Sequence, residues 1–139
     1  MASDQVTELR AWARGMYATE AAVELLARAF NGRFTSTGWE WVRRDDEGRM
    51  WIDGEAITLE TTGALSGGER RVLAVVASLL GGAPVDLAEE LPGLDREHAE
   101  LVVAAIAHAT GHHDGATYER VGDQMVPRPA EPILAWPPA

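Results

Sequence analysis

Histidine and aspartate side chains gather over residues 108–114, where they could supply metal-assisted chemistry. Imidazole and carboxylate are zinc ligands, and the step from His108 to His112 can place two imidazoles on one helix face. Gly111 is expected to end that helix, however, and the chain has no cysteine and no H-E-x-x-H motif. We therefore interpret the histidines as complementing a helix dipole and predict no metal and no cofactor. The weaker alternative is a metal-dependent hydrolase with the ligands His108, His112, His113 and Asp114.

A second group of side chains suits binding better than catalysis. Trp39, Trp41 and Trp51 fall in one short stretch of the chain. Tryptophans usually fill a core, but on an outward face they would form a protein-binding patch. Apolar anchors in a Pro-rich segment can also dock into a groove of a partner. The anchors in question are Ile133, Leu134 and Trp136, and we predict that both groups bind protein.

One carboxylate stands apart from the other acids. Glu20 lies near the middle of an apolar helical stripe. A buried, unpaired carboxylate would cost several kcal/mol. If Gly15 breaks the helix, Glu20 would instead lie in the first turn of a second helix; otherwise it needs a partner such as Arg49 or Arg70.

The stretch that begins "GALSGGER" contains "LSGGE", which is similar to the signature loop of ATP-binding cassette ATPases. In those proteins the loop acts on a nucleotide held by a phosphate-binding loop, and this chain has neither G-x-x-x-x-G-K-[ST] nor any lysine. Ser66 and Glu69 fit a capping box instead, in which each side chain bonds the backbone N–H of the other residue. We interpret the similarity as coincidental and predict that Ser66 starts a core helix.

Composition and charge exclude several kinds of chemistry and argue against one class of partner. All 12 basic residues are arginines against 22 acids, which gives a formal net charge of −10. The absence of lysine excludes Schiff-base catalysis, and the absence of cysteine excludes disulfides and thiol nucleophiles. A net negative chain repels phosphates, which argues against nucleic acid and favours a protein partner.

Hydrophobic periodicity predicts one α+β domain over residues 1–115 and an extended or flexible Pro-rich tail over residues 116–139. Five of the seven prolines lie between Pro127 and Pro138, which argues against helix there. The elements expected in the domain are a long N-terminal helix (4–30), a Trp-rich antiparallel β-hairpin around "DDEG", and a compact three-helix segment (70–80, 86–91 and 95–110).

The three-helix segment leaves a second function open. A helix, a short helix and a longer helix follow one another as in winged-helix DNA-binding regulators. The expected recognition helix begins with "DREHAE", however, which holds one arginine among three acids. Side chains that recognise DNA bases usually have to donate hydrogen bonds, which acids cannot do. Our main hypothesis is a non-enzymatic acidic adaptor or regulatory subunit that binds another protein, with self-association left open.

The location follows from what the chain lacks. The longest apolar runs, Val72–Leu80 and Leu101–Ala107, are shorter than the roughly 20 residues that cross a bilayer. The first residues show no apolar core of a signal peptide. We therefore expect no membrane association and a cytoplasmic location.

Two stretches also carry a family resemblance. The chain resembles an uncharacterised family of small proteins from high-GC actinobacteria through "GALSGGERRVLAVVASLL" and "VDLAEELPGLDREHAELVVAAIAHA". Because we know of no activity in that family, the resemblance implies no functional residue.

Overall fold

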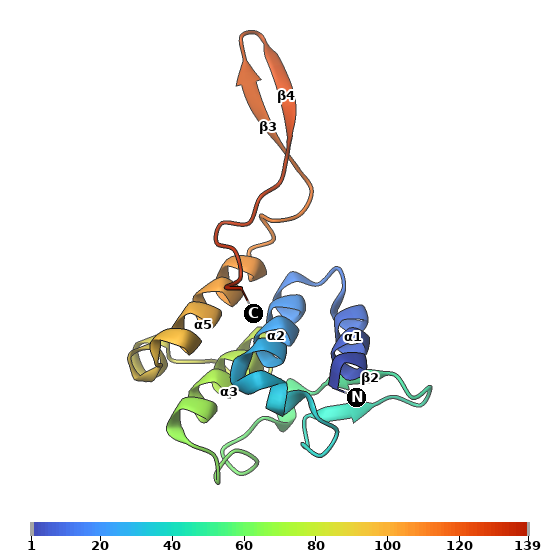
Figure 1. Ribbon diagram of the computed structural model, residues 1–139, viewed down its shortest axis with the longest axis vertical. Coiled ribbons are helices and arrows are strands. Elements are labelled where there is room, and N and C mark those ends of the chain that lie inside the picture. The colour runs from blue at the N-terminus through green and yellow to red at the C-terminus, as the bar shows by residue number, and fades with distance from the viewer. Residues whose placement is uncertain (1, 139) are drawn as a thin grey trace.

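The computed structural model describes residues 2–138, with side chains from Asp4 onward, and it is an α+β structure. Its helices and strands are α1 (Ala2–Ala13), α2 (Tyr17–Arg28), β1 (Val42–Arg44), β2 (Met50–Ile52), α3 (Gly67–Leu79), α4 (Leu87–Glu90), α5 (Arg96–Ala109), β3 (Ala116–Val121) and β4 (Gln124–Pro129). Short 3-10 turns are η1 (Ala29–Thr35), η2 (Gly54–Ala56) and η3 (Leu91–Gly93). The larger helices form a body from which the hairpin of β3 and β4 projects (Figure 1). No helix within residues 2–138 is long and apolar enough to span a bilayer.

The N-terminal region forms two helices and not the single long helix that the periodicity predicted. Helices α1 and α2 lie side by side and are divided at Gly15, whose φ of 91° is a left-handed conformation that glycine adopts freely (Figure 1). Glu20 therefore lies in the first turn of α2, where its Oε2 accepts a hydrogen bond of 2.8 Å from the backbone N–H of Gly15. This is the alternative that the sequence offered for Glu20.

The first β-hairpin is shorter than predicted and holds one tryptophan instead of three. Strands β1 and β2 pair antiparallel from Val42↔Ile52 to Arg44↔Met50, so that Trp51 lies in β2. Trp39 and Trp41 precede β1, in a loop whose aromatic rings pack on one another and on Phe34. The turn does use Gly48 at a positive φ of 81°, as expected.

The C-terminal helices of the body follow the predicted order, α3, α4 and α5. The capping box is confirmed: Ser66 Oγ accepts from the N–H of Glu69, and Glu69 Oε1 accepts from the N–H of Ser66. Asp95 caps α5 by accepting from the N–H of His98. Helix α5 packs chiefly on α2. The core is formed by side chains such as Leu9, Leu25, Trp41, Leu73 and Val102.

The region predicted as an extended or flexible tail contains a second antiparallel hairpin. Strands β3 and β4 pair from Ala116↔Pro129 to Val121↔Gln124 around the turn Gly122-Asp123. Gly122 has a φ of 61°, and glycine with positive φ at the first turn position is typical of a type II′ hairpin. The prolines of β4 argued against helix, and Pro can occupy an edge strand where no ladder bond is needed.

Candidate functional site

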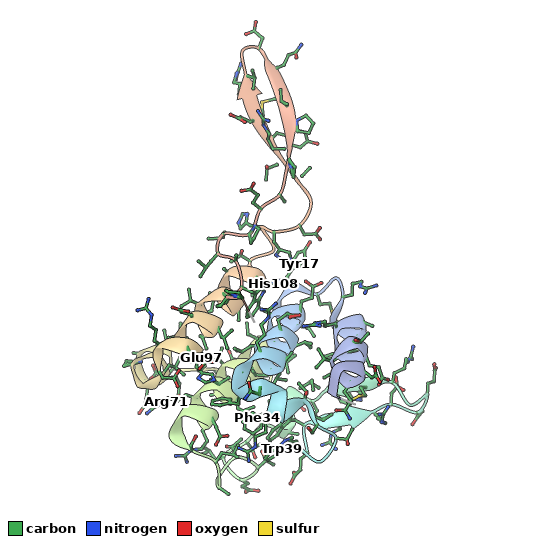
Figure 2. All side chains as sticks on the ribbon, in the orientation of Figure 1. Tyr17, Phe34, Trp39, Arg71, Glu97 and His108 are labelled. Atoms are coloured by element: carbon green, nitrogen blue, oxygen red, sulfur yellow. The ribbon has the colours of Figure 1, made fainter. Side chains whose placement is uncertain are left out.

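The tryptophans predicted to bind a partner are largely committed to packing. Trp41 is fully buried, and its Nε1 donates to the carbonyl oxygen of Phe34 at 2.9 Å. Trp39 is half-buried and stacks on Trp41 with ring centroids 5.0 Å apart. Trp51 is half-buried against Trp12. Figure 2 shows Trp39 and Phe34 close together on the body. The expectation of a binding role is therefore wrong for Trp41, because a fully buried ring cannot meet a partner.

The predicted anchors at the end of the chain divide in two. Ile133 and Leu134 are exposed, whereas Trp136 is half-buried against α2 and α5. The guanidinium of Arg28 lies 5.0 Å from the centre of the Trp136 ring and also donates to the carbonyl oxygen of Pro137 at 3.1 Å. The chain that follows the hairpin is thus held against the body by the contacts of Trp136 and Pro137 with Arg28.

The hairpin of β3 and β4, which we call the arm (residues 116–129), stands clear of the body in Figure 1. All its side chains are exposed except that of Val126, which is half-buried. Tyr118 and Met125 are 63% and 60% exposed. Cross-strand partners share a face, so one face of the arm is formed by Ala116, Tyr118, Arg120, Met125, Pro127 and Pro129.

The two edges of the arm differ in their hydrogen-bonding capacity. In a hairpin with a two-residue turn, the pair next to the turn exchanges hydrogen bonds and the following pairs alternate. The register places Pro127 and Pro129 at positions whose backbone N–H would point outward. Because proline has no N–H, the outer edge of β4 lacks these donors. The outer edge of β3 keeps the amides of Tyr118 and Arg120.

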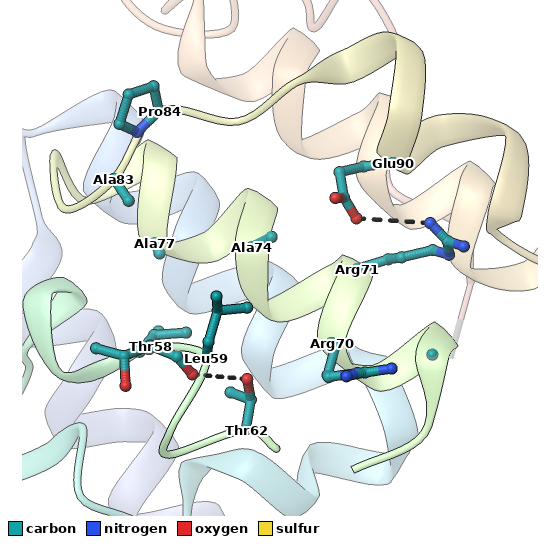
Figure 3. A pocket seen from close by; sticks show the side chains of 12 residues that line it. Thr58, Leu59, Thr62, Arg70, Arg71, Ala74, Ala77, Ala83, Pro84 and Glu90 are labelled. Carbon is teal, nitrogen blue, oxygen red and sulfur yellow. Dashed lines mark hydrogen bonds and ion pairs between the residues drawn. The ribbon is translucent and has the colours of Figure 1, made fainter. Parts of the chain in front are cut away.

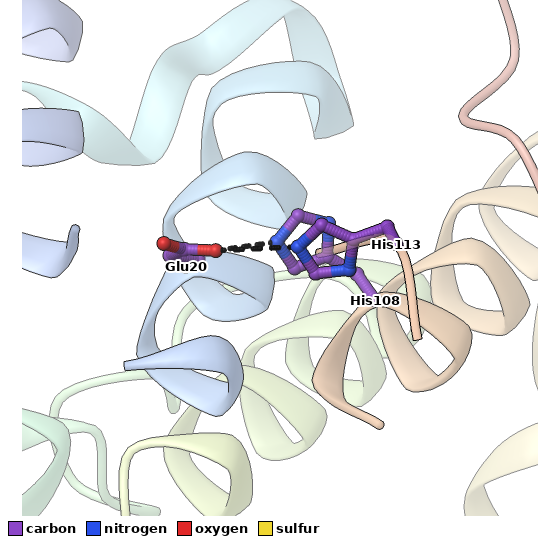
Figure 4. Close-up of side chains that lie close together, drawn as sticks. All are labelled: Glu20, His108 and His113. Atoms are coloured by element: carbon purple, nitrogen blue, oxygen red, sulfur yellow. Dashed lines mark hydrogen bonds and ion pairs between the residues drawn. The ribbon is translucent and has the colours of Figure 1, made fainter. Parts of the chain in front are cut away.

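At the base of the arm the structure brings together three side chains that the sequence did not connect. Glu20 from the first turn of α2, His108 from the last turn of α5 and His113 from the following loop converge in Figure 4. The Nε2 atoms of His108 and His113 lie 2.9 Å and 3.7 Å from Glu20 Oε1. We call these three residues the Glu-His-His cluster.

The loop that carries His113 is held by contacts to α2. The Tyr17 hydroxyl donates to Asp114 Oδ2 at 3.0 Å, and the Tyr17 ring meets His113 edge-on with centroids 5.4 Å apart. This hydrogen bond is the largest cause that lowers the pKa of Asp114, and the same bond raises the pKa of Tyr17. His112 is exposed. Of the predicted ligand set, only His108 and His113 join the cluster, while His112 and Asp114 do not.

The charge of Glu20 is stabilised by its neighbours. Burial alone would raise the pKa of this carboxyl. The hydrogen bonds from the Gly15 N–H and from His108 outweigh burial and lower the pKa below its ordinary value. Glu20 and His108 also line a small pocket of about 210 Å³, to which Arg10, Arg14 and Glu24 contribute. The partner of Glu20 is thus a histidine, and not Arg49 or Arg70 as in the second alternative from the sequence.

A larger hollow of about 430 Å³ runs beside α3 (Figure 3). Gly67 and Arg70 of the "LSGGER" stretch line it, together with Arg71, which pairs with Glu90 at 3.7 Å. Glu69 is fully engaged by the capping box and by an ion pair with Arg33. The stretch thus serves the start of α3, in agreement with the interpretation from sequence.

Comparison with known proteins gives no assignment. No family model matches the chain, and the searches against curated proteins and against solved structures give no match. The resemblance to small actinobacterial proteins stays a prediction. Function therefore has to be argued from the arm and from the Glu-His-His cluster.

Proposed function

We propose that the protein is a non-enzymatic adaptor or regulatory subunit and that the arm is its main contact with another protein. The observation that carries this proposal is the arm itself, a hairpin with exposed side chains on both faces. An isolated two-stranded hairpin is marginal in water. A partner that covers the arm would supply the burial that the body does not give it.

The free edge of β3 indicates how such a partner would bind. The outward amides of Tyr118 and Arg120 can pair with a strand of the partner, which is the mode of β-strand addition. Tyr118 in β3 and Met125 in β4 are exposed on the same face of the arm, and tyrosine and methionine are enriched in interfaces. Ile133 and Leu134, which follow the arm in the chain, are also exposed apolar side chains.

Charge also favours the arm over the body as the contact. The arm carries two arginines, Arg120 and Arg128, and two acids, Glu119 and Asp123, so its formal charge is zero. The rest of the chain therefore carries the whole net charge of −10. A protein partner can approach the arm without the repulsion that an acidic surface exerts on acidic neighbours.

Site-specific photocrosslinking in the native host tests the proposal. A photoreactive phenylalanine analogue at position 118 is expected to capture one other protein, identified by mass spectrometry. The same analogue at exposed Glu55 on the body is the control and should not capture it. Capture of only a second copy of the chain, or equal capture from both positions, would contradict the proposal.

A pair of substitutions tests the mode of binding. Arg120→Pro removes an outward amide and no bond of the arm's own ladder, whereas Arg120→Ala keeps that amide. Strand addition requires the captured protein to be lost with R120P and retained with R120A. If both variants capture the partner equally, the partner binds side chains of the arm and not its edge.

A further inference from the structure

The Glu-His-His cluster has the donor set of a transition-metal site. One ligand atom from each of Glu20, His108 and His113 lies within 4.8 Å of the others. Two imidazole nitrogens with one carboxylate oxygen form a set that zinc and related divalent ions accept, and His2Glu is a known three-ligand arrangement for zinc. Glu20 is 88 residues from His108 in the sequence, so the fold brings the carboxylate to the two histidines.

The spacing of the ligand atoms fits one ion between them. Bonds of 2.0–2.1 Å in a tetrahedral zinc site place neighbouring ligand atoms about 3.4 Å apart. The distances from Glu20 Oε1 to Nε2 of His108 and of His113, 2.9 Å and 3.7 Å, lie on either side of that value. The rings of His108 and His113 stack with centroids 3.9 Å apart, so binding of a shared ion would require the two rings to turn away from each other until both lone pairs point at the ion.

His113 has no hydrogen bond of its own in the described part of the chain. Its side chain is 20% exposed, yet its Nδ1 is buried without a partner. Its Nε2 is aimed at Glu20 from 3.7 Å, which is too long for a hydrogen bond. A metal between Nε2 and the carboxylate would give this ring a bond at the nitrogen that faces Glu20, and it would leave Nδ1 as it is.

The carboxylate is already oriented for ligation. The Gly15 N–H holds Oε2 of Glu20 at 2.8 Å, which leaves Oε1 facing the two imidazoles. Outer contacts of this kind fix ligand orientation in metal sites. The loop of His113 is fixed in turn by the bond between Tyr17 and Asp114.

We propose that Glu20, His108 and His113 bind one divalent transition-metal ion, Zn²⁺ being the best match to the donor set. Three protein ligands leave the fourth position of a tetrahedral ion to water or to a small ligand. Glu20 and His108 also line the pocket of about 210 Å³, in which Arg10 is already paired with Glu24. This inference does not rest on the proposed role of the arm.

Metal binding at Nε2 of His108 and the contact of Trp136 with Nδ1 require opposite tautomers of the His108 ring. The indole N–H of Trp136 can only donate, and it lies 3.4 Å from His108 Nδ1, so Nδ1 is the acceptor and the proton of the neutral ring is on Nε2. A metal needs the lone pair of Nε2, which moves the proton to Nδ1. Two N–H groups then face each other, and the contact of Trp136 is lost. Metal binding therefore loosens the fastening of residues 136–138.

Titration with metal tests this inference on protein that carries no polyhistidine tag. Calorimetry with ZnCl₂ after chelator treatment is expected to give one ion per chain, and Co²⁺ is expected to give the intense visible absorption of a four-coordinate ion. Glu20→Gln and His113→Ala should each weaken binding by more than the roughly 10- to 100-fold that loss of an outer-shell contact causes. His113 lies in a loop, so H113A leaves every helix intact.

Two further variants make the test specific. His112→Ala removes an exposed neighbouring imidazole and should leave affinity unchanged. Trp136→Phe removes the competing donor and should tighten binding about fivefold, the equivalent of one hydrogen bond of about 1 kcal/mol. Absence of binding by the wild-type chain, or equal weakening by H112A and H113A, would overturn the site. Unchanged affinity in W136F would overturn the competition.

Discussion

The backbone of Gly111 lies against the ring of Tyr17, so closely that a Cβ at position 111 would come within 2.5 Å of Cδ2. Gly111 also has a φ of 78°, which L side chains rarely adopt. Glycine therefore ends α5 here for two separate reasons, backbone conformation and lack of space. The loop that carries His113 begins at this point.

Gly111→Ala should lower the free energy of unfolding more than Gly115→Ala. Gly115 has a similar φ of 85° but open space around it, so G115A loses only the roughly 1 kcal/mol of left-handed strain. G111A adds overpacking against Tyr17, which costs about 1–3 kcal/mol. Urea unfolding at neutral pH measures both. Equal losses would show that the Tyr17 ring moves aside freely.

Ser66→Ala should cost about 1 kcal/mol of stability. The substitution removes the hydroxyl that accepts from the N–H of Glu69 and opens the capping box. Ser36→Ala, at an exposed site that follows η1 and caps no helix N-terminus, should change stability by less than about 0.5 kcal/mol. Chemical denaturation of the two variants is the measurement. An equal loss of stability in S36A and S66A would show that the capping box contributes no more than an ordinary surface serine.

Stability should fall in acid because capping carboxylates have lowered pKa values. The N–H of His98 is the largest cause for Asp95, and the N–H of Ser66 is the largest cause for Glu69. A pKa that is lower in the folded state means that the unfolded state binds more protons. The stabilisation is thus complete above the unfolded value of about 4 and is lost as pH falls through the folded value.

The variant Asp95→Asn isolates one of these groups. Asparagine keeps a cap acceptor but does not titrate. The free energy of unfolding, measured by urea at intervals between about pH 6 and pH 3, should therefore fall less steeply in D95N than in the wild type. The same slope in both proteins would show that Asp95 contributes nothing to acid lability.

Trp41→Ala should destabilise the fold by about 3–5 kcal/mol, the range for a large aromatic side chain removed from a core. Trp41 is 0% exposed, and its removal also leaves the carbonyl oxygen of Phe34 without its bond. Trp51→Ala, at a half-buried site, is the comparison and should cost less. Thermal and urea unfolding report the difference. Similar losses would mean that the loop around Trp41 repacks.

Local patterns in the sequence predicted part of the body of the protein. Ser66 and Glu69 lie three residues apart, so their capping box could be recognised before α3 was seen. Most of residues 4–30 are helical, but the prediction of one long helix was wrong, because the periodicity continued across Gly15 and hid the reversal between α1 and α2. Glycine fits inside a helical pattern as well as between two helices, so the break remained one alternative among others.

The candidate sites were harder to predict because long-range contacts create them. Glu20 and His108 were each noticed, yet they are 88 residues apart and no local pattern joins them. His112 and His113 are neighbours in sequence, but the turn after α5 exposes the first and directs the second at Glu20. The arm was missed because its prolines suggested an unpaired tail, whereas Pro127 and Pro129 lie where the ladder needs no N–H.

The prolines of β4 also set a limit on assembly. Strands that leave an open edge on both sides can stack without end, which is how fibrils grow. Here Pro127 and Pro129 leave Met125 as the one residue of β4 with an outward amide, so a further strand adds more readily beside β3 than beside β4. An arm of this kind favours complexes of fixed stoichiometry over polymerisation, even at high concentrations of the chain.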